Sequence, residues 1–167
     1  MKGKITDKNG FTLIELVTVI MIAAILSAIA GMGLVQIANG YVFARKNAAV
    51  AQQAQIALTR LVKELSAIQS VSAATATSLT YQRKNELTGS TETHTLSWAG
   101  AGQPVALDGD ALVEPVHSFD LQYYTYNYTT RIFTASAYSS ATAVIELTLT
   151  LKGYEGTPLT FVERVTI

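Results

Sequence analysis

The best candidate for a functional residue in this sequence is one acidic side chain inside an apolar segment. Glu15 is the only Lys, Arg, Asp or Glu between Lys8 and Arg45. A charged side chain inside a bilayer costs about 3 kcal/mol or more, so such residues are rare and usually serve a function. A carboxylate removed from water also needs a partner. The sequence therefore predicts that Glu15 acts together with a second polar or charged group.

The segment around Glu15 is long enough to cross a membrane. No charged residue occurs between Leu16 and Ala44, and a membrane-spanning helix needs about 20 apolar residues. Residues 1–10 carry three lysines against one aspartate, which favours a cytoplasmic N-terminus and an exported C-terminal part. A secretory signal has a shorter apolar core and a small-residue cleavage site after it. We therefore expect a single-pass membrane protein.

The residues that open the apolar segment, Gly10-Phe11-Thr12-Leu13-Ile14-Glu15, resemble the N-terminal signature of type IV pilins and of the pseudopilins of type II secretion. In that family a prepilin peptidase cuts after the glycine, and the new N-terminal residue is N-methylated. The resemblance implies a leader peptide over residues 1–10, a cut between Gly10 and Phe11, and methylation of Phe11.

The resemblance also implies a partner for Glu15, namely the Phe11 amine of a neighbouring subunit. In a helix the two residues lie about 6 Å apart along the axis. A charge pair in low dielectric costs desolvation, so its value is axial registry in a filament more than stability. A pair with the chain's own Phe11 amine is the alternative. A glycine before the cut suits a protease, because it lets the enzyme approach the backbone closely.

The apolar segment continues into an amphipathic pattern without any proline before Pro104. Apolar positions recur at steps of three and four residues, as on one face of a helix. They are Val50, Ala54, Ile56, Ala57, Leu58, Leu61, Leu65 and Ile68. The pattern predicts one helix from residue 12 to about residue 70. Its transmembrane, assembly half covers residues 11–38, and its amphipathic half covers residues 39–70.

Two glycines interrupt the transmembrane half. Met32, between Gly31 and Gly33, stands where the family commonly has a proline. Glycine costs about 1 kcal/mol in a helix interior. One hypothesis is that residues 31–33 bend or melt in an assembled filament. The alternative is that these glycines only allow close helix packing.

Residues 71–167 predict a β-rich exported head of four to six antiparallel strands packed on the helix. Alternating apolar runs or strand-rich segments occupy residues 78–83, 91–98, 113–126, 145–151 and 159–167. Turns are expected at 85–90 and 153–158. The expected fold class is α+β and pilin-like, with a long N-terminal helix on a small antiparallel sheet. This order of elements resembles minor pilins and minor pseudopilins more than major pilins.

The head offers little catalytic chemistry. His94 and His117 match no zinc-binding spacing, and the sequence has no cysteine, no nucleophile elbow and no phosphate-binding loop. We therefore expect that the protein is not an enzyme and binds no cofactor. The one acidic cluster, Asp108, Asp110 and nearby Glu114, leaves calcium as an alternative. An Asp-Gly turn explains the same residues without a metal.

Four tyrosines, Tyr123, Tyr124, Tyr126 and Tyr128, form the densest aromatic group. Their partial alternation predicts two in the core and two at the surface. Exposed aromatic side chains could bind a partner subunit or a surface. Packing in the core and at the sheet edge is the simpler account.

The expected function is that of a structural subunit of a type II secretion pseudopilus or a type IV pilus. Its expected partners are other pilin or pseudopilin subunits, prepilin peptidase, the inner-membrane assembly machinery and the lipid bilayer. The net charge of zero gives no indication of nucleic-acid contact. The expected location is the bacterial inner membrane, with a cytoplasmic N-terminus and an exported head, and then an extracytoplasmic filament. An exported binding domain on a plain membrane anchor is the alternative.

Overall fold

The computed structural model describes residues 11–167 and contains one long helix, α1, over Leu13–Ser66. The predicted helix was therefore right in kind, but its predicted end near Ser70 was wrong. Ile68 already belongs to strand β1, because its backbone pairs with a neighbouring strand and stops extending the helix. The chain divides into two compact units at the Ala44–Arg45 bond.

In the first unit, α1 presents its apolar side chains outward on every side. Leu13, Met21, Ile29 and Ile37 are each more than half exposed. The hydroxyls of this segment are satisfied locally, since Thr18 donates to the Ile14 carbonyl at 2.8 Å and Ser27 to the Ala23 carbonyl at 2.7 Å. The helix therefore offers an almost wholly apolar outer surface.

In the second unit, α1 is amphipathic as predicted. Its buried residues recur at helical spacing: Ala54, Ala57, Leu58, Leu61 and Leu65. Two predicted members of this face do not belong to it. Ile56 is 65% exposed, because it lies off the buried stripe, and Ile68 lies in β1.

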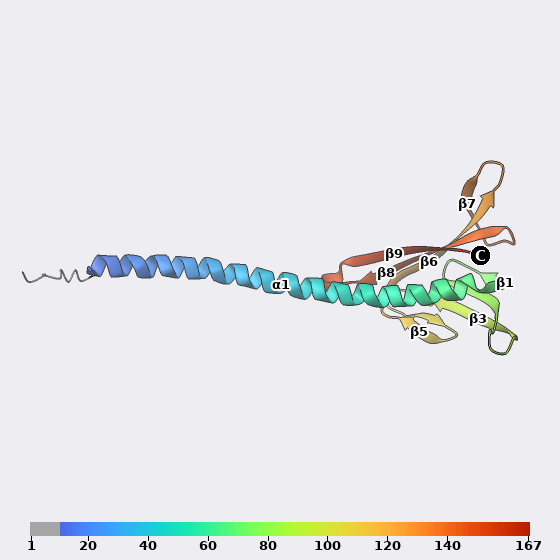
Figure 1. Cartoon of the computed structure of the whole chain (residues 1–167), viewed down its shortest axis with the longest axis horizontal. Coiled ribbons are helices and arrows are strands. Elements are labelled where there is room, and N and C mark those ends of the chain that lie inside the picture. Colours follow the sequence, from blue (N-terminus) through green and yellow to red (C-terminus); the bar gives the residue numbers. More distant parts are fainter. Residues whose placement is uncertain (1–10) are drawn as a thin grey trace, which may run out of the picture. The chain divides into compact units, whose positions relative to one another are not determined.

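Within residues 11–167, nine strands form two antiparallel sheets, which exceeds the predicted four to six strands. Figure 1 shows the sheets alongside the C-terminal part of α1. The first sheet has the order β1-β2-β3-β4-β5. Its strands are β1 (Ile68–Ala74), β2 (Ser78–Lys84), β3 (Thr91–Trp98), β4 (Val105–Leu107) and β5 (Asp110–Val113). The second has the order β7-β6-β8-β9. Its strands are β6 (Val116–Asn127), β7 (Ile132–Ser136), β8 (Thr142–Lys152) and β9 (Pro158–Thr166).

The predicted strand over 113–126 is divided in the structure. A cis peptide bond at Glu114-Pro115 separates β5 from β6. Proline donates no backbone hydrogen bond, so it interrupts a ladder. The other predicted strands and both turns are present, with a short 3₁₀ turn over Tyr154–Gly156 before β9.

The core of the second unit lies between the helix and both sheets. It combines the buried stripe of α1 with Leu79 and Leu96 of the first sheet and Leu147 and Leu149 of the second. The antiparallel sheets and long apolar helix give the α+β pilin-like fold that the sequence predicted.

Candidate membrane anchor and assembly site

The carboxylate of Glu15 closes a capping box at the start of α1. Its Oε2 accepts hydrogen bonds from the Thr12 backbone N–H and the Thr12 hydroxyl, both at 3.3 Å. The Glu15 N–H in turn donates to Thr12 Oγ1 at 3.3 Å. Thr12 is thus the N-cap residue and Glu15 the third helical residue, which reciprocally satisfies two backbone donors. Glu15 therefore has a local partner in the free chain.

This capping box was missed in the sequence analysis, although the Thr-x-x-Glu spacing is itself a signal for it. The Thr-x-x-Glu motif lies within the longer signature from Phe11 to Glu15, so it was interpreted only as part of that signature. The structure adds a second role for the same carboxylate. It does not test the predicted pair between Glu15 and a Phe11 amine, which stays a prediction.

Phe11 precedes the helix and is 82% exposed. Gly10 and the leader lie outside the described residues, so cleavage at Gly10–Phe11 and methylation of Phe11 stay predictions. Because Phe11 is not helical, a cut before it would remove no helical hydrogen bond. The first hydrogen bond of the helix runs from Leu16 N–H to the Thr12 carbonyl, at 3.2 Å.

The helix that follows is long and apolar enough to cross a membrane, and its most apolar window buries no residue in this structure. Apolar area of this extent is normally covered by lipid or by other protein. The segment between Gly31 and Gly33 is helical, and a Cβ added at either glycine would meet nothing within 4 Å. Bending in a filament therefore stays a prediction, and close packing of another helix at these glycines stays the alternative.

A chain of charged side chains joins α1 to the first sheet. Glu64 pairs with Arg83 at 2.9 Å. Arg83 Nε donates to His94 Nε2 at 3.2 Å, and His94 Nδ1 lies 2.6 Å from Asp108 Oδ2. Because Nε2 accepts from Arg83, the ring proton lies on Nδ1 and is donated to Asp108. His94 thus links Arg83 to Asp108.

Asp108 sits in a two-residue turn between β4 and β5. Asp108 and Gly109 have φ values of 55° and 89°, as an Asp-Gly hairpin turn requires. Partial burial acts to raise the pKa of the Asp108 carboxyl. Hydrogen bonds from His94 and the Thr95 N–H outweigh that effect and hold the pKa below its ordinary value.

The acidic residues considered for calcium do not converge. Among residues 11–167, no three His, Asp or Glu side chains gather as ligands for a metal ion. Asp108 uses both carboxylate oxygens within the protein, for His94 and the Thr95 N–H. The turn therefore accounts for Asp108 and Gly109, and calcium binding stays an untested alternative. His117 is exposed on β6.

The tyrosine group divides between core and surface. Tyr123 is buried, and its hydroxyl donates to the Thr75 carbonyl at 2.7 Å. Burial, with a smaller contribution from Asp120, raises the pKa of Tyr123. Tyr124 and Tyr126 are half-buried, whereas Tyr128 is 86% exposed. The predicted division into two core and two surface tyrosines was therefore wrong, because one is buried, one is exposed and two are half-buried.

One comparison with known proteins gives a match. A family model described as the prokaryotic N-terminal methylation motif matches residues 5–31. No curated protein and no solved structure matches the chain.

The capped start of α1, its exposed apolar side chains and the two antiparallel sheets define an α+β protein whose N-terminal helix is long and apolar enough to cross a membrane. The methylation motif matched over residues 5–31 makes the N-terminal segment similar to that of type IV pilin-like precursors.

Proposed function

We propose that this chain is a minor pilin or pseudopilin, a structural subunit of a type II secretion pseudopilus or a type IV pilus. The observation that carries the proposal is the methylation motif, which leads directly into a helix with its apolar side chains exposed all round. In a bilayer, lipid covers this surface. In a filament, the same surface packs against the helices of neighbouring subunits.

The geometry at Phe11 and Glu15 supports the order of events. Phe11 lies before the first helical hydrogen bond, so a peptidase can cut before it without unwinding α1. The cut creates an amine next to a capped carboxylate. Each subunit then carries one new cation and one anion at the same end of its helix, as axial pairing with a neighbour requires.

The proposed location follows from the same segment. The leader stays in the cytoplasm, the apolar half of the helix over residues 11–38 is anchored in the bacterial inner membrane, and the rest of the chain is exported. The inner-membrane assembly machinery then moves the processed subunit into an extracytoplasmic filament.

The experiment that tests the proposal is an intact mass measurement on chain purified from membranes of cells with and without prepilin peptidase. With the peptidase, the expected mass lacks residues 1–10 and carries one added methyl group. The Gly10→Val variant is the control, because a β-branched side chain obstructs the approach of the protease to that bond. Full-length, unmethylated chain in cells with an active peptidase would instead support a binding domain on a plain anchor.

A further inference from the structure

The outer edge of β7 lacks the protection that the other sheet edges of the described chain carry. Unpaired strand edges recruit other strands, and natural proteins block them with charges, prolines or bulges. Strand β1 is bulged at two places and the β4–β5 ladder at one. Strand β9 begins with Pro158 and carries Glu163 and Arg164. Strand β7 reads Ile-Phe-Thr-Ala-Ser, pairs with β6 in unbroken register, and has all five residues exposed.

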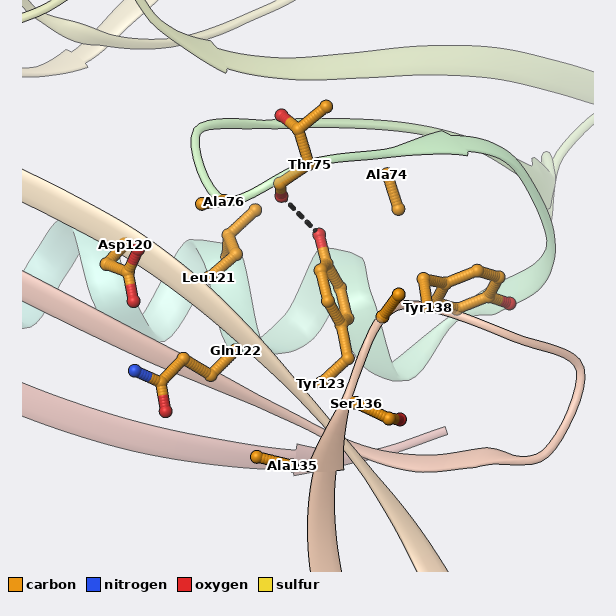
Figure 2. A pocket seen from close by; sticks show the side chains of 11 residues that line it. Ala74, Thr75, Ala76, Asp120, Leu121, Gln122, Tyr123, Ala135, Ser136 and Tyr138 are labelled. Carbon is orange, nitrogen blue, oxygen red and sulfur yellow. Dashed lines mark hydrogen bonds between the residues drawn. The ribbon is translucent and has the colours of Figure 1, made fainter.

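The two ends of β7 differ in size. Ile132 and Phe133 are large, and the Phe133 ring lies 4.9 Å from that of Tyr126. Ala135 and Ser136 are small and line an open cavity of about 390 Å³, which residues of β6 and of the β1–β2 turn also line. Figure 2 shows this cavity, with the Tyr123 hydroxyl directed at Thr75. The strand thus has a bulky aromatic end and a small-residue end beside a hollow.

The two ends also differ in charge. Arg131 directly precedes β7 and is exposed. Asp120 lines the cavity at the other end (Figure 2). Neither side chain forms a salt bridge with another residue in the described range. An uncompensated cation therefore precedes β7, and an uncompensated carboxylate on neighbouring β6 lines the cavity beyond its other end.

We propose that β7 pairs antiparallel with β7 of a second copy of this chain, around a two-fold axis at Thr134. In that register Phe133 of one copy faces Ala135 of the other, and Ile132 faces Ser136. Large side chains meet small ones on both faces of the new ladder. Arg131 comes opposite Ala137, at the rim of the cavity that holds the other copy's Asp120. The axis repeats each of these contacts.

The choice of a second copy follows from this pattern. A strand of unrelated sequence could form hydrogen bonds with the backbone of β7. It would not in general carry a cation at one end and small residues at the other, as the pattern of β7 requires. The antiparallel self-pair matches size and charge together. The contact is isologous and closes after two copies. It therefore makes a dimer of heads and is separate from filament assembly through α1, so it does not rest on the proposed function.

The test uses single-cysteine variants of the full-length chain in proteoliposomes, which is clean because the sequence has no cysteine. Thr134→Cys places the two thiols opposite each other on the axis, within the range of a cross-strand pair. Ser70→Cys, an exposed residue on bulged β1, is the matched control. Under mild oxidation we expect disulfide dimers at position 134 and only background at position 70. Equal cross-linking at both positions would overturn the proposal.

The register is tested by exchanging charges in the Thr134→Cys background. Arg131→Glu alone places two acidic pairs across the axis, and Asp120→Arg alone places two basic pairs. Like charges brought close together repel, and exposed charge pairs contribute modestly, so each variant alone should cross-link about two- to fivefold less. Mixing the two variants restores both opposite-charge pairs and should restore cross-linking. No loss in either variant alone, or no recovery in the mixture, would refute the register.

Discussion

The two roles of Glu15 can be separated by changing each of its two partners. Glu15→Gln keeps the capping box, because glutamine serves at the third helical position, and removes the charge. Thr12→Val keeps the charge and removes the hydroxyl that bonds Glu15 on both sides. Glu15→Ala removes both and serves as the reference for complete loss. If Glu15 sets axial registry through its charge, only the two Glu15 variants should fail in filament assembly.

The expected cost of losing the cap differs enough from the cost of losing the charge pair to distinguish the two roles of Glu15. Losing an N-cap costs about 1 kcal/mol, which is about a fivefold change in an equilibrium. Leaving a buried charge without its partner costs about 3–5 kcal/mol, which is more than about a hundredfold. The capping bonds here are 3.3 Å long at an exposed helix end, so the cap lies at the low end of its range. Thr12→Val should therefore incorporate nearly normally.

The assay measures the fraction of subunit in sheared filaments against the fraction left in the membrane. Intact mass first confirms that each variant is cleaved and methylated, so that an assembly defect is not mistaken for a processing defect. Glu15→Gln should match Glu15→Ala and be nearly absent from filaments. Normal incorporation of Glu15→Gln together with loss of Thr12→Val would show that Glu15 serves as a cap and would refute the registry role.

Three further predictions concern the head. The lowered pKa of Asp108 means that its contribution to stability is present above its unfolded pKa, about 3.9, and is lost as pH falls through the folded pKa. Asp108→Asn should therefore flatten the loss of melting temperature below about pH 4. Gly153→Ala should lower the free energy of unfolding by about 1–3 kcal/mol in urea titrations, because the added Cβ would overlap Asn47 Oδ1, which accepts a hydrogen bond from the Tyr154 N–H. Added calcium should leave the melting temperature unchanged, since both Asp108 oxygens have partners within the chain; a rise would instead support the calcium alternative.

The parts of the fold that could be predicted from the sequence are those whose periodicity is long and regular. Strand β3 was predicted with the bounds that the structure shows, and β8 was predicted because apolar and polar residues alternate from Ile145 to Leu151. The half-buried character expected of β8 was wrong, since Glu146 and Thr150 on its polar face are buried as well. Short strands carry too few alternations to be distinguished from loops. Strand β4 has three residues, and β7 has no buried face to impose a pattern. The end of α1 was missed because Ile68 fits the helical spacing, and only the pairing of β1 with β2 excludes it from the helix.

The candidate site at the start of α1 could be predicted from the sequence only in part. Glu15 was identified because a charge in an apolar segment stands out in any sequence. Its partner in the free chain was not, because a cap depends on where the helix begins, and the predicted start at Thr12 places that residue inside the helix. In the structure α1 begins one residue later. This single step turns Thr12 from a helical residue into the N-cap.

The cap and the proposed registry pair are better understood as successive states of one carboxylate than as rivals. A free subunit in the bilayer must hold Glu15 without a neighbouring amine, and an unsatisfied carboxylate there is costly. The two Thr12 hydrogen bonds lower that cost while remaining weak enough, at 3.3 Å, to be exchanged. A cationic amine on a neighbour forms a stronger, charge-assisted bond and can displace them. On this reasoning Thr12→Val should act mainly before assembly, by lowering the amount of subunit stable in the membrane, and should leave the axial spacing of completed filaments unchanged.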